Sequence, residues 1–275
     1  MDLLFVGTGA ADYLQLLRCP CPTCSAARSL GGRNIRTHAC VLVDGSLLVD
    51  CGPTVPWRLA EEHASACDVR HLLLTHSHGD HLDGDAVRTV AEARPAGTDS
   101  PPRALEAWGN GAAMARIEAA APGVLCHEIA PGWQGTIGDH EVLALPANHI
   151  VQQERALTFV IRRAGSAFLY ATDTAWPPDT WWQLLAAETL DCAVIEATFG
   201  PLGPEEHPHC LTEHLNWAEL SRLVEELRAR GILKPDAVVW ATHLSQHFVP
   251  PHEQWAPVVE GEYLHVAYDG LRLSV

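Results

Sequence analysis

The chain has 275 residues, of which 47% are hydrophobic, so it can bury a sizeable core. Its 18 basic residues stand against 34 acidic ones, and the net charge of −16 argues against a nucleic-acid backbone as the main partner. A small anionic substrate is compatible with this charge, because bound divalent cations reverse its sign locally. The 16 histidines are a high number for this length and indicate metal chemistry.

The first residues predict a β-strand and not an export signal. Leu3–Val6 is a short apolar run with no basic residue before it, and Gly7-Thr8-Gly9 follows as a tight turn. No stretch approaches the roughly 18 to 20 apolar residues that a membrane-spanning helix needs. We therefore expect a cytoplasmic protein without a membrane partner, whose nine cysteines are reduced thiols or metal ligands.

Three cysteines stand close together in the sequence CPCPTC. Cys19, Cys21 and Cys24 lie in a loop at about 19–24 that two prolines stiffen. Three thiolates at this spacing can occupy three corners of a tetrahedral zinc site, whose fourth ligand must come from elsewhere. The alternative is a set of buried or disulfide-forming cysteines. We favour the zinc site because disulfides are rare in cytoplasmic proteins.

The following segments predict a hairpin, a helix and a buried strand. The hairpin joins 39–43 to 47–50 through the turn signal Asp44-Gly45, and a helix runs from about 56 to 65. The apolar run at 71–74 is too short for a helix and predicts a strand. The side chains just before the hairpin could bind an anionic substrate or be solvated loop residues: Arg33, Arg36 and His38.

The stretch from Thr75 to Gly84 reads THSHGDHLDG and follows that strand directly. It contains four metal-capable side chains within six positions: His76, His78, Asp80 and His81. Packing such strongly hydrated groups together without a cation would cost desolvation and repulsion. Alternating positions send two of the rings to the same side of an extended backbone. We therefore expect one loop that serves two adjacent metal ions.

Helices and strands alternate through the rest of the chain. Helices are predicted at 82–93, about 109–120, about 178–188 and 216–230, the last with Asn216 as its N-cap, and a Pro- and Gly-rich loop at 94–103. Short strands are predicted within 128–147 and at 157–163, 167–171, 192–196 and 237–241, and two more close the chain. No repeat or long linker interrupts the pattern, so we expect a single domain over residues 1–275.

Three further polar residues share the context of the central loop. His149, Asp173 and His243 each come just after a predicted apolar strand. The ends of strands in parallel or mixed sheets are where functional groups are commonly presented. We therefore expect these three side chains to join the central loop at one edge of the sheets.

With these residues in view, the sequence resembles the metallo-β-lactamase superfamily of hydrolases. The resemblance rests on THSHGDH at 75–81, the lone His149, Thr172-Asp173-Thr174 and Thr242-His243. It implies an αββα sandwich, in which two sheets are covered on their outer faces by helices. It also implies two metal sites that Asp173 bridges, one formed by His76, His78 and His149 and the other by Asp80, His81 and His243.

A narrower resemblance is to the PhnP-type phosphodiesterases, on the cysteine cluster after a GTG turn and on Thr242-His243-Leu244-Ser245. It implies a structural zinc held by the three cysteines and His247, although this chain has Gln246 where that histidine is expected. It further implies catalytic roles for Asp80, Asp173 and a histidine ahead of the long helix. His214 fits that placement better than the alternatives His209 and His207.

These resemblances imply a phosphodiesterase that acts on a small cyclic phosphate or a nucleotide-like ester. Its two active-site cations would be zinc or manganese, since imidazoles and carboxylates suit both. The alternatives are a lactone or thioester hydrolase of the same fold, and a non-catalytic metal-dependent binding protein related to pyrroloquinoline quinone biosynthesis. The acidic charge disfavours a tRNA-processing nuclease. A homodimer is compatible with the sequence, which does not decide the oligomeric state.

Overall fold

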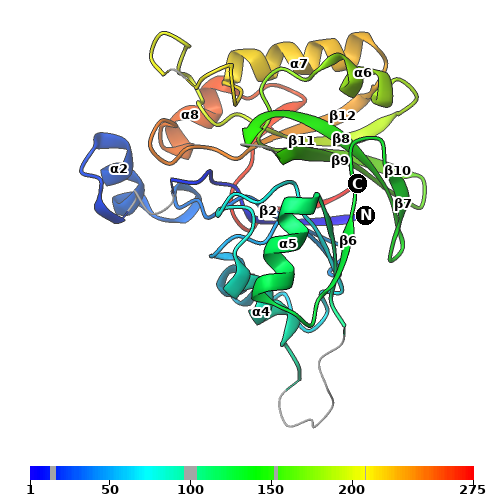
Figure 1. The fold of residues 1–275 in the computed structure, drawn as a ribbon. Coiled ribbons are helices and arrows are strands. Elements are labelled where there is room, and N and C mark those ends of the chain that lie inside the picture. Colours follow the sequence, from blue (N-terminus) through cyan, green and yellow to red (C-terminus); the bar gives the residue numbers. More distant parts are fainter. Residues whose placement is uncertain (13–16, 96–103, 152–153, 208) are drawn as a thin grey trace.

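Two seven-stranded β-sheets form the centre of the protein in the computed structural model (Figure 1). The structure describes residues 1–12, 17–95, 104–151, 154–207 and 209–275. The first sheet has the strand order β14-β1-β2-β3-β4-β5-β6, and the second has the order β13-β12-β11-β10-β9-β8-β7. The strands are Asp2–Gly7 (β1), Cys40–Val43 (β2), Leu47–Val49 (β3), His71–Leu73 (β4), Glu106–Gly109 (β5), Leu125–Glu128 (β6), Gln134–Ile137 (β7), His140–Val151 (β8), Glu154–Arg163 (β9), Ser166–Ala171 (β10), Leu190–Glu196 (β11), Leu233–Thr242 (β12), Leu264–Val266 (β13) and Arg272–Ser274 (β14).

Each sheet combines an antiparallel part with a parallel part. In the first sheet, β14, β1, β2 and β3 pair antiparallel, whereas β3 to β6 pair parallel. In the second sheet, β7 to β10 pair antiparallel, whereas β10 to β13 pair parallel. Parallel neighbours end at the same edge of a sheet, so the segments that follow β10, β11 and β12 emerge side by side.

Helices cover the outer face of each sheet. The buried residues of α3, α4 and α5 share one apolar cluster with the first sheet, and those of α6, α7 and α8 share another with the second (Figure 1). The helices are Pro22–Leu30 (α2), Val55–Glu61 (α3), Gly84–Ala91 (α4), Gly111–Ala120 (α5), Asp179–Leu185 (α6), Trp217–Ala229 (α7) and His252–Val259 (α8), with a 3₁₀ turn at Gly32–Asn34. Among the described residues, none of these helices is both long and apolar enough to cross a membrane.

A third apolar cluster fills the space between the two sheets. Phe5 and Leu73 of the first sheet meet Phe159, Phe168 and Val194 of the second, and all five are fully buried. Burial of aromatic and branched side chains from both inner faces is what holds two stacked sheets together. The fold is therefore the αββα sandwich that the sequence predicts.

Helix α7 shows how the local sequence specifies an element. The side chain of Asn216 accepts a hydrogen bond from the backbone N–H of Glu219 at 2.9 Å, which confirms the predicted N-cap. Two helices escaped the sequence analysis. Helix α2 begins inside the predicted cysteine loop, and α8 contains Pro257, a residue that normally argues against a helix. Most of the predicted loop at 94–103 falls on residues 96–103, outside the described part.

The context expected for His149 is wrong. This residue lies within β8 and not in a loop after a strand. The pairing of β8 with β9 shifts register between Pro146, opposite Leu157, and Ile150, opposite Arg155. Three residues of β8 therefore face a single residue of β9 in a bulge, next to a proline that has no N–H for the ladder. Such a bulge can redirect a side chain toward a functional site.

We predict that Leu223→Ala destabilises the fold by about 2–5 kcal/mol, because Leu223 of α7 is fully buried against the second sheet and its truncation leaves a cavity. The control is Glu225→Ala on the exposed side of the same helix, which should change stability by less than about 0.5 kcal/mol. Urea unfolding of both variants measures the difference. Equal midpoints for the two variants would contradict this packing.

Candidate metal centre

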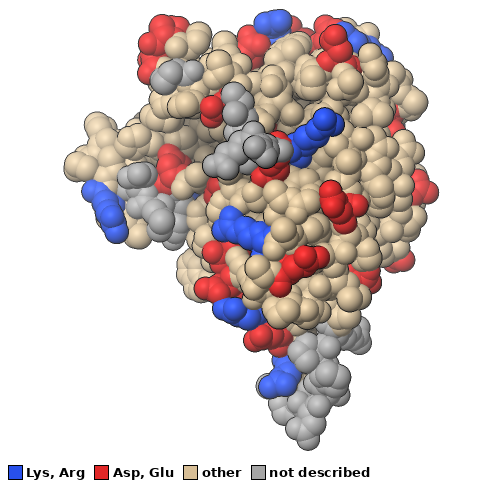
Figure 2. Space-filling view, in the orientation of Figure 1, with Lys and Arg blue, Asp and Glu red and all other residues tan. Residues whose placement is uncertain are grey.

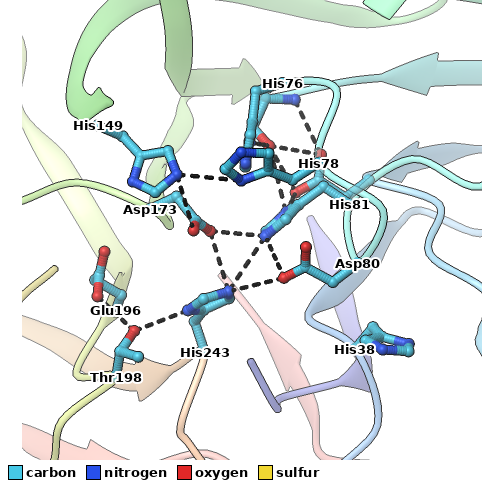
Figure 3. A network of polar contacts seen from close by, with 12 residues as sticks. His38, His76, His78, Asp80, His81, His149, Asp173, Glu196, Thr198 and His243 are labelled. Carbon is cyan, nitrogen blue, oxygen red and sulfur yellow. Dashed lines mark hydrogen bonds and ion pairs between the residues drawn. The ribbon is translucent and has the colours of Figure 1, made fainter. Parts of the chain in front are cut away.

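The loop after β4 and three distant residues converge at one rim of the sandwich (Figure 3). Potential ligand atoms lie within 4.8 Å of one another in each of three groups. These groups are His76 with His78 and His149, Asp80 with His81 and His243, and His76 with His81 and Asp173. All seven side chains that the sequence analysis selected are therefore neighbours, and Asp173 lies between the other two groups.

Unusual backbone geometry positions two of these residues. Asp173, just after β10, has φ 49°, and His243, just after β12, has φ 51°. Residues other than glycine rarely adopt this left-handed conformation, and it persists only where the surrounding structure enforces it. Asp50, just after β3, has φ 65°. Strained strand ends of this kind cluster at functional sites.

The carboxylate of Asp50 organises the loop from beneath. It is fully buried and accepts hydrogen bonds from the backbone N–H and the hydroxyl of Thr75, both at 2.9 Å. It also accepts one from Nδ1 of His81 at 2.8 Å. From the sequence, Asp50 is predicted only as the end of a strand. An acidic residue at the end of a buried apolar strand was the signal that could have identified it.

These hydrogen bonds determine which imidazole nitrogens carry lone pairs. Nδ1 of His81 must donate to the Asp50 carboxylate, and Nδ1 of His243 donates to the hydroxyl of Thr198 at 2.8 Å. Both Nε2 atoms are then free to act as ligands. They lie 3.2 Å apart, and they are 2.7 and 3.1 Å from Oδ2 of Asp173. Atoms that only accept hydrogen bonds repel one another at these distances unless a proton or a metal cation lies among them.

In the group of His76, His78 and His149, Nε2 of His76 is likewise available as a ligand. The hydroxyl of Thr75 donates to Asp50 and can accept from Nδ1 of His76 at 3.0 Å, which leaves Nε2 of His76 as an acceptor. This Nε2 is buried and has no hydrogen-bond partner among the described residues. Buried polar atoms are normally satisfied, so this orphaned atom fits the position of a metal ligand.

The electrostatics of the cluster call for positive charge. Burial lowers the pKa of His81, but the carboxylates of Asp173, Asp80 and Asp50 outweigh it and raise that pKa well above its usual value. The pKa of His76 shifts in the opposite direction. Burial and the neighbouring His81 hold it well below the usual value. The residues present therefore fit a pair of cations, which would replace the proton on His81 and use neutral His76 as a ligand.

His214 lies beside this cluster. Its Nδ1 is 3.1 Å from both carboxylate oxygens of Glu196 and 3.8 Å from Oδ1 of Asp173, and its ring stacks on His243. Burial lowers the pKa of His214, yet the Glu196 carboxylate outweighs burial and raises that pKa to about 9. Glu196 is fully buried and was missed by the sequence analysis, which treated it as a strand residue. It also accepts from the backbone N–H of Leu215 at 3.1 Å.

The alternatives to His214 lie further out. The side chain of His209 is 55% exposed, and its Nδ1 is 3.1 Å from the carboxylate of Glu213. The ring of His207 packs against Phe199, with centroids 4.6 Å apart. All three histidines line a cavity of about 260 Å³ that also contains Asp80, His149, Asp173 and His243. Of the three, His214 contacts the candidate metal ligands Asp173 and His243.

Neither interpretation of Arg36 is correct. This side chain is buried, and it donates to the hydroxyl of Thr8 at 2.9 Å and to the carbonyl of Ala267 at 2.6 Å. Burial lowers its pKa to about 10, and the nearby carboxylate of Asp269 opposes that shift. Arg36 therefore ties the N-terminal segment to the last strands and is neither a solvated residue nor part of the metal centre.

The cysteine cluster forms a separate group with His247. Cys19, Cys21, Cys24 and His247 have their ligand atoms within 4.8 Å of one another. Nδ1 of His247 lies 3.7 Å from Sγ of Cys21 and 3.5 Å from Sγ of Cys24. Gln246 instead directs its side-chain oxygen to the backbone N–H of Arg36 at 3.1 Å. The histidine one position later in the chain is thus the one that joins the cysteines.

Comparison with known proteins agrees with this architecture. Residues 46–234 match the model of the beta-lactamase superfamily domain. A protein named metal-dependent hydrolase from Alkaliphilus metalliredigens is 27% identical over 58% of this chain and 69% of its own length. A ribonuclease Z of Pseudomonas putida is 35% identical, but over only 39% of this chain and 31% of that enzyme.

Solved structures with the same fold cover nearly the whole chain. A diphosphatase of the PhnP family superposes with a TM-score of 0.74 at 21% identity, over 99% of this chain and 96% of that one. Zinc-bound PqqB of Methylobacterium extorquens gives a TM-score of 0.73 at 16% identity and covers 100% of both chains. The short form of human tRNase Z gives 0.67 at 18% identity, over 100% of this chain and 99% of that one. The chain belongs to the metallo-β-lactamase superfamily of metal-dependent hydrolases.

Proposed function

We propose that the protein is a dinuclear metal-dependent phosphodiesterase that acts on a small cyclic phosphate or nucleotide-like ester. The observation that carries the proposal is the juxtaposition of two ligand groups around Asp173 with the buried pair of His214 and Glu196. The two ligand groups around Asp173 can hold a pair of cations, and His214 with Glu196 can hold a proton next to them.

In this proposal, His76, His78 and His149 hold one cation, Asp80, His81 and His243 hold the second, and Asp173 contacts both. When bound, zinc or manganese at these positions would supply hydroxide at neutral pH and stabilise negative charge on a phosphate. Asp50 and Thr198 orient the ligand imidazoles of His81 and His243 through their Nδ1 atoms. Asp80 and Asp173 contribute the negative charge that offsets the cations.

His214 would act as the proton donor to the leaving alkoxide. The carboxylate of Glu196 favours the imidazolium form, which is the form that can give up a proton. Its position beside Asp173 and at the wall of the cavity supports a proton donor next to the proposed cations. Glu196 is a positioning residue in this scheme, since it contacts His214 and not the cavity.

A small substrate is supported by the cavity and the charge. The cavity of about 260 Å³ is small, and on the face shown in Figure 2 the described Lys and Arg side chains are scattered among acidic ones without forming a continuous basic patch. RNA binding depends on such a patch, so we favour a small phosphodiester over the RNA processed by ribonuclease Z. A structural neighbour is named a diphosphatase of the PhnP family, which is consistent with a phosphate-containing substrate.

Turnover assays separate this proposal from its alternatives. Purified protein loaded with zinc or with manganese is given bis-p-nitrophenyl phosphate, a lactone and a thioester. Turnover of the phosphodiester alone supports the proposal, and turnover of either carboxylic substrate alone supports the ester hydrolase. Full metal occupancy without turnover of any of them indicates a binding protein.

Asp173→Ala should lower phosphodiesterase activity at least about a hundredfold and reduce the content of active-site metal, because one carboxylate serves both proposed cations. Asp236→Ala, which removes an exposed carboxylate on β12, should leave both unchanged. Elemental analysis and initial rates on the same preparations measure the two effects. Retention of full activity by Asp173→Ala would refute the dinuclear centre.

His214→Asn should slow the hydrolysis of diesters with an alkyl leaving group by about 10²–10⁴-fold. The effect on a p-nitrophenyl leaving group should be much smaller, since p-nitrophenolate departs without a proton. His209→Asn is the matched control. If that variant instead shows the selective loss, His209 is the proton donor.

We also propose that Cys19, Cys21, Cys24 and His247 hold a structural zinc. Cys24→Ser should release this zinc and lower the melting temperature, because metal binding at such a site contributes directly to folding. Cys126→Ser removes a half-buried thiol outside the cluster and should retain the zinc. Zinc analysis with thermal unfolding tests this pair of variants, and unchanged zinc content in Cys24→Ser would disprove the site.

A further inference from the structure

Three aromatic rings line one wall of the active-site cavity. Phe199, His207 and Phe248, here called the aromatic wall, all border the same cavity as the candidate metal ligands. The Phe199 ring stacks on Phe248 with centroids 5.7 Å apart and an interplanar angle of 27°. The ring of His207 lies 4.6 Å from Phe199 and 5.1 Å from Phe248. The wall is therefore a continuous aromatic surface.

The wall is attached to the same segments as the catalytic cluster. Phe199 directly follows Thr198, whose hydroxyl receives the hydrogen bond from His243, and its own backbone N–H donates to the carbonyl of Leu215 at 3.2 Å. The backbone N–H of Phe248 donates to the hydroxyl of Ser245 at 3.2 Å, just after the loop that carries His243. These bonds hold the rings at a defined place relative to the metal centre.

Phe248 keeps part of its ring accessible. The chain has five phenylalanines, and Phe5, Phe159 and Phe168 are 0% exposed in the core. Phe199 is 3% exposed, whereas Phe248 and His207 are only partly buried. Exposed aromatic carbon is unfavourable in water, so a ligand that covers it gains free energy. Burial and the neighbouring His209 and His214 lower the pKa of His207, which keeps its ring neutral.

The wall adjoins His214, the proposed proton donor to the leaving group. The His214 ring contacts Phe199 edge-on, with centroids 5.8 Å apart, and it stacks on His243 at 5.6 Å. A group that takes a proton from His214 would therefore lie near the aromatic wall. Asp80 and Asp173, proposed ligands of the cations that would bind the phosphate, line the same cavity. A substrate with an anionic phosphodiester and a planar ring on its leaving alcohol matches both the proposed cations and the wall.

We propose that the aromatic wall stacks the nucleobase of a nucleoside leaving group, so that the preferred substrates are phosphodiesters of nucleosides. This inference rests on the proposed phosphodiesterase function and specifies its substrate class. In the reaction, the oxygen of water bonds to phosphorus and the bond from phosphorus to the nucleoside oxygen breaks. One hydrogen of that water is in effect transferred to the departing oxygen, and the other stays on the new phosphate monoester.

The test compares two diesters that differ only in the base. One is the methyl diester of adenosine 5′-phosphate, and the other is the same diester of methyl riboside, in which a methoxy group replaces adenine. Stacking of one base should give the adenosine diester a kcat/KM about tenfold higher or more. The expected products are adenosine and methyl phosphate. Release of methanol and adenosine 5′-phosphate would instead mean that the nucleoside stays on the phosphoryl group and is not the leaving group.

Variants of Phe248 test whether the aromatic wall causes the preference for the adenosine diester. Phe248→Leu should abolish most of the preference for the adenosine diester, and Phe248→Tyr should retain it, because only the second keeps an aromatic face. Trp57→Leu removes an exposed aromatic ring on α3, outside the cavity, and should change nothing. Zinc content and melting temperature are measured for each variant, because Phe248 adjoins His247.

The outcomes are distinguishable. Hydrolysis of both diesters at equal kcat/KM, release of adenosine 5′-phosphate, or an unchanged preference in a folded Phe248→Leu protein would each overturn the inference and leave the phosphodiesterase proposal intact. Failure of metal-loaded protein to hydrolyse any diester, including bis-p-nitrophenyl phosphate, would overturn the proposed function itself.

Discussion

The metal centre depends on mutual repulsion that the protein alone does not relieve. Around Asp173, the Nε2 atoms of His81 and His243, whose Nδ1 atoms donate elsewhere, face carboxylate oxygens at about hydrogen-bond distance. These three side chains are buried, so water screens their charges only weakly. The carboxylates raise the pKa of His81 well above its usual value, which favours a proton that partly compensates the negative charge. Divalent cations would compensate it fully, and the residues then have the chemistry of ligands.

The two sheets make this arrangement rigid. Asp50 follows a strand of the first sheet and fixes the loop at 75–81 from below, whereas Glu196 ends a strand of the second sheet and fixes the loop that carries His214. Each is a fully buried carboxylate with several hydrogen-bond donors. Because these two groups lie on different sheets, packing between the sheets sets the distance between the candidate metal ligands and the proposed proton donor. The inner core thus contributes to the geometry of the candidate site.

The segment after β12 connects the candidate metal centre with the aromatic wall and the cysteine cluster. The segment after β12 carries His243 of the metal centre, Phe248 of the aromatic wall and His247, which reaches the cysteine cluster. Asp12 accepts from Ser245 and from the backbone of Gln246 and His247, which holds this segment against the N-terminal region. A short stretch of chain therefore positions the candidate structural site, the cavity wall and a metal ligand together.

The sequence by itself determined the αββα fold, the N-cap of α7 and the seven side chains that converge at the candidate metal centre. It did so because amphipathic periods, capping residues and the density of ligands at 76–81 are local patterns. Only the tertiary structure decided the roles of Asp50 and Glu196, the bulge that directs His149, the burial of Arg36 and the choice of His247 over Gln246. These features join segments far apart in the chain, such as Arg36 and Ala267, which are 231 positions apart. A buried carboxylate receives its function from the donors that packing brings to it, and a strand sequence does not specify those donors.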